Sequence, residues 1–174
     1  MSIIDISDLN KLRNSYKIIH NKDPIIGVTF SCFDLLHSGH VLMLEDSKNK
    51  CDILVIGLQT DPTVDRSHKN KPVLSFEERL IMVKSIKYVD HIIKYTRESE
   101  LIDILKKLKP DIRILGNDYL GKDFTGKDLG IETYYHDRFI HKYSTTTLRE
   151  RVYNAENGRY DKPPRPGRSS PAVN

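Results

Sequence analysis

The sequence predicts an α/β protein with a doubly wound parallel sheet of five strands and helices on both faces. Short apolar runs alternate with helical segments of amphipathic spacing, which is the pattern that parallel βαβ units produce. Polar segments follow three of the strands at their carboxyl ends, at 31–40, 116–122 and 136–144. In sheets of this kind ligands bind beyond those ends, at the topological switch point. We therefore expect these three segments to form a ligand site.

The first third of the chain predicts two strands and two helices. Ser7 or Asp8 can cap an N-terminal helix, because the apolar residues after them recur with helical spacing. The apolar run 25–30 predicts the first strand of the sheet, and 53–58 predicts the second. Between them, 41–46 indicates a helix that starts directly after a tight turn.

The middle of the chain adds two helices and one strand. A polar loop at 59–70 leads to Ser75, which has a glutamate three residues later and so forms a capping box for a helix at 76–86. The run 88–95 predicts the third strand. The amphipathic segment 98–109 predicts a helix, which Pro110 ends.

The last part completes a Rossmann-like sheet. Strands are expected at 112–115 and 131–135, with a loop and a short helix at 122–130 between them. A final short helix is expected at 146–153. Beyond it Pro, Gly, Arg and Ser dominate, and such a composition cannot bury a core.

Length and composition indicate a single domain at 24–153, with a helical extension at 1–23 and a disordered tail at 154–174. The chain has 174 residues, of which 38% are hydrophobic and 30% are charged, which suffices for a core. The net charge is +4, and residues 151–174 carry five Lys or Arg against two Asp or Glu. The domain is therefore near neutral and shows no basic stripe, so we expect no nucleic-acid partner.

The sequence favours a reducing, membrane-free setting. Apolar runs such as 53–56 are too short to cross a bilayer, and the first residues do not resemble a signal peptide. Cys32 and Cys51 are the only cysteines, too few for a disulfide framework and too far apart for a structural zinc site. We expect a cytoplasmic protein without a membrane partner.

Two histidines lie at the predicted start of a helix, in Phe33-Asp34-Leu35-Leu36-His37-Ser38-Gly39-His40. Free backbone N–H groups and the helix dipole attract phosphate at such a position. A glycine there lets a phosphate approach the backbone. A lone histidine would be a satisfied core residue, but two in an HxGH arrangement after a buried strand indicate a nucleotide-phosphate site.

Several motifs, in the same order, resemble those of the cytidylyltransferase-like nucleotidyltransferases over about 25–152. The segment 31–40 is similar to their HxGH signature, and Arg79 matches the arginine of their second helix. Residues 116–119, Gly-Asn-Asp-Tyr, resemble their Gly-Asp-Asp-Trp. Residues 144–146 match their Ser-Thr-Thr element at the start of the last helix. The likeness is greatest to the glycerol-3-phosphate cytidylyltransferases.

This resemblance implies transfer of CMP from CTP to a small phosphorylated acceptor, either glycerol 3-phosphate or a related sugar or alcohol phosphate. Pyrophosphate leaves after direct in-line attack, so the enzyme positions the reactants and stabilises charge. Mg²⁺ would bridge the triphosphate, mainly through phosphate oxygens rather than protein ligands. The resemblance also implies a homodimer that pairs across the sheet edge near Lys87 and Asp90.

The resemblance implies roles for three groups of residues. Catalytic contacts, including hydrogen bonds from the imidazoles to the α- and β-phosphates, fall to His37, His40, Lys69, Lys71 and Arg79. Nucleotide contacts fall to Ser31, Cys32, Phe33, Gly39, Asn117, Asp118, Tyr119, Ser144, Thr145 and Thr146. The acceptor phosphate would meet Arg138, His141 or Lys142, because the family's Arg-Thr-Glu-Gly is replaced at 139–142.

Plainer interpretations stay open for some of these residues. The hydroxyls at 144–146 could only cap a helix, and Asp118 could only form a turn. Lys69 and Lys71 could be solvated loop charges. Arg79 could form a surface ion pair with a neighbouring glutamate.

Two other functions also stay open. Cys32-Phe33-Asp34 resembles the heptose-phosphate and FAD-type adenylyltransferases of the same superfamily, which would replace CTP by ATP. The other rival is a nucleotide-binding module without turnover, against which the intact HxGH and Ser-Thr-Thr elements argue. Ser31 stands where the family usually has glycine, so the substrate is less determined than the chemistry.

Overall fold

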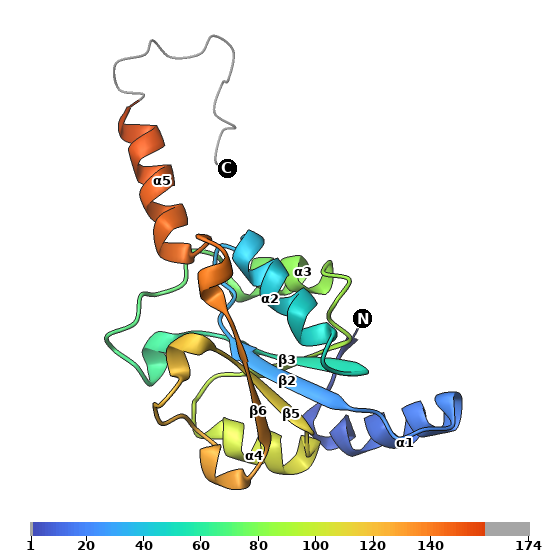
Figure 1. The fold of residues 1–174 in the computed structure, drawn as a ribbon. Helices are drawn as coiled ribbons and strands as arrows, with labels where there is room; N and C mark the ends of the chain where they lie inside the picture. The colour runs from blue at the N-terminus through green and yellow to red at the C-terminus, as the bar shows by residue number, and fades with distance from the viewer. Residues whose placement is uncertain (1, 159–174) are drawn as a thin grey trace, which may run out of the picture.

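A computed structural model describes residues 2–158 of the chain, and it contains one parallel sheet. The strand order is β1-β4-β3-β2-β5-β6 (Figure 1). The strands are β1 Ser2–Ile3, β2 Ile26–Ser31, β3 Ile53–Gln59, β4 His91–Tyr95, β5 Ile112–Gly116 and β6 Glu132–His136. Every pair is parallel, so the five predicted strands are confirmed.

The sixth strand, β1, was not predicted. Ser2 and Ile3 pair with His91 and Ile92 at the outer edge of β4. Two residues are too short to show a period in the sequence, so only the open edge of β4 determines that they are extended. The segment expected as a purely helical extension therefore begins as a strand.

The helices are α1 Leu9–His20, α2 Ser38–Lys48, α3 Phe76–Lys84, α4 Glu100–Leu108 and α5 Thr145–Asn157. Short 3₁₀ segments are η1 Ile6–Asp8, η2 Pro62–Val64, η3 Asn117–Tyr119, η4 Lys127–Leu129 and η5 Arg138–Ile140. Asp8 is the N-cap residue of α1, but its side chain pairs with Lys11 instead of capping. Helix α5 runs past the predicted end at 153, and the rest of the expected tail, 159–174, lies outside the described residues.

The helices cover both faces of the sheet, as predicted. Helices α2 and α3 lie on one face, and α1 and α4 lie on the other (Figure 1). Alternate residues of β3 supply the two cores: Leu54 and Ile56 pack toward α2 and α3, whereas Ile53 and Val55 pack toward α4. A strand buried on both faces explains the continuous apolar run in the sequence.

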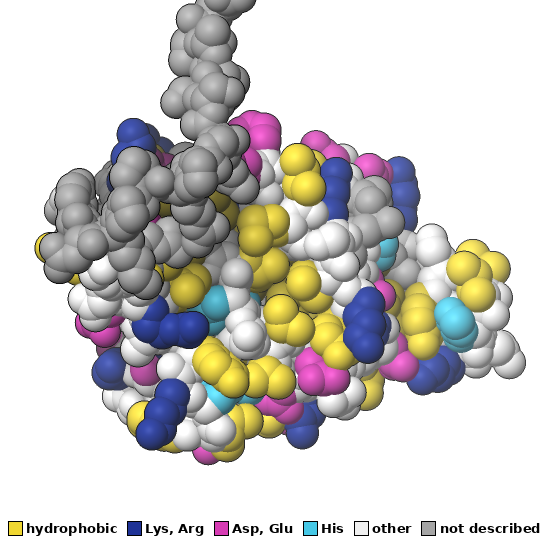
Figure 2. Space-filling model, turned by 90° about the horizontal axis from the view of Figure 1, so that it is seen from above, with side chains coloured by type: hydrophobic (Ala, Val, Ile, Leu, Met, Phe, Trp, Pro, Cys, Tyr) yellow, Lys and Arg dark blue, Asp and Glu magenta, His cyan; other side chains and the backbone are white. Residues whose placement is uncertain are grey.

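Helix α5 differs from the others because it projects away from the body of the domain (Figure 1). Its first residue, Thr145, contacts His37 at the start of α2, while Val152 and Tyr153 farther along are exposed. Figure 2 views the molecule from the side of this helix and shows apolar and charged side chains interspersed on that face. No helix within residues 2–158 is both long and apolar enough to cross a membrane.

Candidate active site

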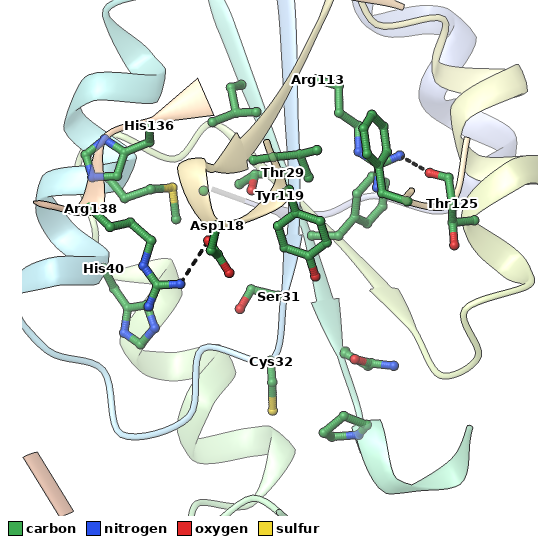
Figure 3. A pocket seen from close by; sticks show the side chains of 18 of the residues that line it. Thr29, Ser31, Cys32, His40, Arg113, Asp118, Tyr119, Thr125, His136 and Arg138 are labelled. Carbon is green, nitrogen blue, oxygen red and sulfur yellow. Dashed lines mark hydrogen bonds and ion pairs between the residues drawn. The ribbon is translucent and has the colours of Figure 1, made fainter. Parts of the chain in front are cut away.

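A cavity of about 700 Å³ opens at the carboxyl ends of the strands, where the three polar segments meet. Figure 3 shows its two ends. His40, His136 and Arg138 lie at one end, and Arg113 and Thr125 lie at the other. The predicted location of the ligand site therefore agrees with the geometry of the fold.

The two histidines of the HxGH turn close the first turn of α2. His37 is the N-cap residue, and its Nδ1 accepts from the Gly39 backbone N–H at 3.0 Å. The Nδ1 of His40 accepts from the His37 backbone N–H at 3.4 Å. The two rings stack with their centroids 4.0 Å apart. Because each ring accepts at Nδ1, the proton of the neutral imidazole lies on Nε2.

Both imidazoles are held in the neutral form. Burial, followed by the nearby His37 and Arg138, lowers the pKa of His40 to about 3. Burial also lowers the pKa of His37, and His141 and Arg138 act in the same direction. Near neutral pH the pair therefore offers two Nε2–H donors and no positive charge, which suits hydrogen bonding to phosphate oxygens.

Gly39 lets the start of α2 approach the loop before α5. A Cβ at this position would lie 2.7 Å from the Tyr143 carbonyl oxygen and 3.0 Å from ring carbons of His37 and His141. No side chain fits at such a distance from a backbone atom. The glycine is therefore required because two chain segments approach closely here, whether or not a phosphate also approaches the backbone at this point.

Of the three hydroxyls at 144–146, Thr145 reaches the cavity. Its Oγ1 lies 3.3 Å from Nε2 of His37, so the starts of α2 and α5 meet at this point. Ser144 is the N-cap residue of α5, and its hydroxyl accepts from the Thr147 backbone N–H at 3.1 Å. Thr146 is exposed and lies outside the cavity lining. The plainer capping interpretation therefore holds for Ser144.

Asp34 fixes the turn that precedes these histidines. Its carboxylate accepts from the backbone N–H groups of Val73 and Leu74, at 3.0–3.1 Å, and from the Arg149 guanidinium at 2.9 Å. Its side chain is only 10% exposed. One carboxylate thus ties the β2–α2 turn to the loop before α3 and to α5.

Arg79 lies outside the cavity, which corrects the expected catalytic contact. The residue is 1% exposed, and its guanidinium donates to the carbonyl groups of Cys32, Gln59, Thr60 and Leu74. Within residues 2–158 its guanidinium is buried among these carbonyl groups and makes no ion pair, so the alternative of a surface ion pair with a neighbouring glutamate does not hold. With its donors used on backbone carbonyls, Arg79 positions the ends of β2 and β3 beneath the site.

The remaining predicted residues divide between the cavity and its surroundings. Those that line the cavity are Ser31, Cys32, Lys69, Asp118, Tyr119, Arg138 and His141. Phe33 is instead buried in the core, and Lys71 and Lys142 are exposed outside the lining. The Asn117 amide donates to Asp137 at 2.7 Å, so it too lies beside the site.

Asp118 faces Arg138 across the cavity mouth. The Arg138 Nη1 donates to Asp118 Oδ1 at 3.1 Å, and both side chains are about half exposed (Figure 3). The ion pair joins η3 to η5. Asp118 is therefore more than a turn former, and it restrains the arginine at the histidine end of the cavity.

Sequence reasoning missed the polar residues inside the strands. Arg113 lies in β5 and His136 lies at the end of β6, and both are almost fully buried in the cavity wall. The Nδ1 of His136 lies 2.7 Å from Asp46, while its Nε2 is buried and meets no hydrogen-bond partner among residues 2–158. The sequence offered one signal for Arg113, which is that a charged residue stands between Ile112 and Ile114 in the middle of an apolar strand.

Three or more His, Cys, Asp or Glu side chains could chelate a metal ion if they converged. Within residues 2–158 no such group is found. The cavity carboxylates are already engaged, since Asp118 pairs with Arg138 and Glu98 accepts from Thr125.

Comparison with known sequences places most of the chain in one family model. Residues 28–151 match a model described as cytidylyltransferase-like. The bifunctional protein HldE of Helicobacter pylori strain HPAG1 is 35% identical over 139 residues, covering 79% of this chain and 29% of that protein. HldE of a Nitratiruptor species is 32% identical over 148 residues, covering 84% and 32%. The chain thus spans less than a third of these relatives.

Solved structures with the same fold are more distant in sequence. Pantoate-β-alanine ligase from Francisella tularensis has a TM-score of 0.54 at 16% identity, covering 92% of this chain and 80% of that one. Pantothenate synthetase from Thermus thermophilus has a TM-score of 0.56 at 13% identity, covering 92% and 76%. At such identities the likeness shows the fold alone.

Proposed function

The chain belongs to the cytidylyltransferase-like family, and on that premise we propose that it transfers AMP from ATP to a small phosphorylated acceptor. Nucleotidyl transfer is the reaction type of the family to which it belongs. The choice of ATP and the nature of the acceptor are the proposal.

Two observations support ATP over CTP. Cys32-Phe33-Asp34 resembles the heptose-phosphate and FAD-type adenylyltransferases. The similarity to the HldE proteins favours adenylyl transfer as well. The second candidate is cytidylyl transfer to glycerol 3-phosphate or a related phosphate, which the motif resemblance to the glycerol-3-phosphate cytidylyltransferases favours.

The single observation that carries the reaction type is the convergence of two helix starts on a pair of neutral imidazoles. His37 and His40 cap the N-terminus of α2. Thr145 is the first residue of α5, and its Oγ1 lies 3.3 Å from Nε2 of His37. Backbone N–H groups at helix starts and Nε2–H donors both stabilise negative charge without reorganising. A polyphosphate is the ligand that such a site fits best.

In the proposed reaction, an oxygen of the acceptor phosphate attacks the α-phosphorus of ATP. A new P–O bond forms, the bond to the bridging oxygen of the β-phosphate breaks, and that oxygen leaves with pyrophosphate. The imidazoles donate hydrogen bonds to the α- and β-phosphates as negative charge moves toward the leaving group. Lys69, at the cavity wall, adds a mobile positive charge.

Mg²⁺ would neutralise part of the triphosphate charge. Because the described residues form no chelating group, we propose that the ion enters with the nucleotide and is held by phosphate oxygens and water. The protein's own contribution would be to orient the phosphates around it.

The homodimer is also a proposal. The edge of β4 is already covered at His91 and Ile92 by β1, and Asp90 accepts from Leu54 and Lys48 of its own chain. A partner would therefore dock around the exposed Lys87 rather than extend the sheet. Light scattering of the chain and of Lys87→Glu would test this, and a wild-type chain that runs as a monomer would contradict it.

The decisive experiment is a panel of ATP, CTP, GTP and UTP against phosphorylated acceptors, scored by pyrophosphate release and product mass. We expect ATP to be turned over fastest, and His40→Ala to lower the rate by at least roughly 100-fold. Faster turnover with CTP would replace the proposal by the second candidate. Tight nucleotide binding with a rate that is unchanged in His40→Ala would indicate a binding module instead.

A further inference from the structure

Arg113 is a buried cation at the end of the cavity opposite the histidines (Figure 3). It lies in β5, which is hydrogen-bonded on both sides, and it is 4% exposed. Most residues at such a position are apolar, because an ionised side chain loses its hydration there. The chain therefore places a full positive charge where the fold alone would favour leucine or valine.

The hydrogen bonds of Arg113 leave much of its guanidinium unused. Its Nη1 donates to the Thr125 carbonyl at 2.7 Å (Figure 3). Its Nε is buried without a partner. Within the described residues, no carboxylate forms an ion pair with it and no acceptor meets Nη2.

Aromatic rings fix the plane of the guanidinium. Its central carbon lies 4.9 Å from the ring centroid of Phe30 and 5.5 Å from that of Phe124. Rings on which a guanidinium stacks hold it rigidly and still leave its edge free for a planar or tetrahedral anion. The group is thus oriented in advance but lacks a counter-ion.

Nearby charges do not balance it. Glu98 lines the same cavity, but its Oε1 accepts from the Thr125 hydroxyl at 2.9 Å and its Oε2 faces Arg66 at 3.6 Å. Arg66 also donates to Gln59 at 2.7 Å. Asp123 also lines the cavity, but it pairs with Lys127 at 2.7 Å, so these two charges cancel. Arg113 and Arg66 against Glu98 then leave one net positive charge among these side chains.

We propose that Arg113 binds an anionic group of the acceptor that is distinct from the phosphate that attacks, so the preferred acceptor carries an anion at each end. The second anion is a carboxylate or a second phosphate. The proposal rests on the proposed function, because the histidine end is assigned to the triphosphate and the opposite end thereby falls to the acceptor.

Matched acceptors test this directly. Each pair differs in the group distal to a shared phosphate: 3-phosphoglycerate against glycerol 3-phosphate, 6-phosphogluconate against sorbitol 6-phosphate, and fructose 1,6-bisphosphate against fructose 6-phosphate. KM and kcat are measured by pyrophosphate release for the wild type, Arg113→Gln and Arg113→Lys. Arg151→Gln, an exposed position on α5, is the control.

For at least one pair we expect the wild type to prefer the member that carries a second anionic group at its distal end. Arg113→Gln should raise the KM of that member by roughly 10-fold or more, as loss of a charge-assisted hydrogen bond implies. The KM values of the partner that lacks the distal anion and of ATP should stay within about twofold. Arg113→Lys keeps the positive charge but loses the planar, forked guanidinium. Its KM should therefore lie between that of the wild type and that of Arg113→Gln.

The proposal is wrong if the member without the distal anion is preferred in every pair, or if Arg113→Gln affects both members equally. A change confined to the KM of ATP would assign Arg113 to the nucleotide and also contradict it. Calorimetric titration of the three pairs without nucleotide tests the anion site at Arg113 separately from the transfer reaction. Binding that depends on Arg113 without turnover would keep the anion site and reject the transferase reaction.

Discussion

Arg149 and Asp34, 115 residues apart, form an ion pair at 2.9 Å that ties α5 to the turn before the HxGH histidines. The same carboxylate accepts from the backbone of Val73 and Leu74. Three segments that are far apart in the sequence are therefore held by one side chain. At the histidine end of the cavity, Asp34 thus holds together the turn before the histidines, the loop before α3 and α5.

Replacing Asp34 by alanine should lower both stability and rate. The loss of hydrogen bonds to two backbone N–H groups and one guanidinium should reduce the free energy of unfolding by about 2–4 kcal/mol. Urea unfolding measures this, and kcat should fall because Thr145 is no longer held against His37. Glu150→Ala, exposed on α5, is the control; equal effects from the two variants would contradict the assignment.

Gly39→Ala should disturb the contact between α2 and the loop before α5. The added carbon would lie 2.7 Å from the Tyr143 carbonyl oxygen, so one of the two segments must move. We expect a loss of about 1–3 kcal/mol in the free energy of unfolding and at least roughly a tenfold loss in kcat. Ser38→Ala, at the neighbouring position, should change neither. A fully active Gly39→Ala would show that the close approach is not needed.

The partly buried His40 should make stability depend on pH. Its folded pKa of about 3 lies below the unfolded value near 6.5, so the unfolded chain binds the extra proton between these values. Stability from this group is therefore complete above pH 6.5 and decreases as the pH falls toward 3. Between pH 7 and pH 5 the loss should be about 2 kcal/mol.

This pH effect can be isolated by comparing variants. Urea unfolding of the wild type and of His40→Gln at pH 7 and pH 5 gives the slope of the free energy of unfolding against pH for each protein. His68→Gln, at an exposed position, is the control. The slope should be smaller in His40→Gln and unchanged in His68→Gln. Identical slopes for all three proteins would mean that His40 titrates normally in the folded state.

Arg79→Lys should destabilise the fold more than it changes substrate binding. A lysine cannot reach four backbone carbonyls at once, so buried acceptors such as the Gln59 and Thr60 carbonyls lose their donors. We expect a loss of about 2–4 kcal/mol by urea unfolding. Arg97→Lys, at a side chain 63% exposed, should be neutral. A raised KM for the nucleotide at unchanged stability would restore the catalytic role for Arg79.

Part of the site could be predicted because its geometry is local. The Ser75–Glu78 capping box is present as predicted, and the HxGH turn places His37 and His40 at the start of α2. Each of these arrangements depends on residues three positions apart, which the sequence displays directly. The same holds for the apolar runs that became β2 to β6.

Other site residues could not be assigned because their partners are distant. Arg79 follows two glutamates in the same helix, which suggested a surface ion pair. Its acceptors instead include the Cys32 carbonyl, which is 47 residues away in the sequence. Ser144 and Thr145 are adjacent, and only the position of α5 against α2 decides which hydroxyl caps and which enters the cavity.

The sequence by itself therefore determined five of the six strands, the helices between them and the parallel sheet, since these follow from periodicity, and its contiguous motifs indicated the family. The tertiary structure alone decided that β1 covers the edge of β4, that Arg79 supports the site from below, and that Arg113 faces the far end of the cavity. The physical reason is that a long polar side chain is placed by its acceptors and its burial. Both are supplied by segments that come together only on folding.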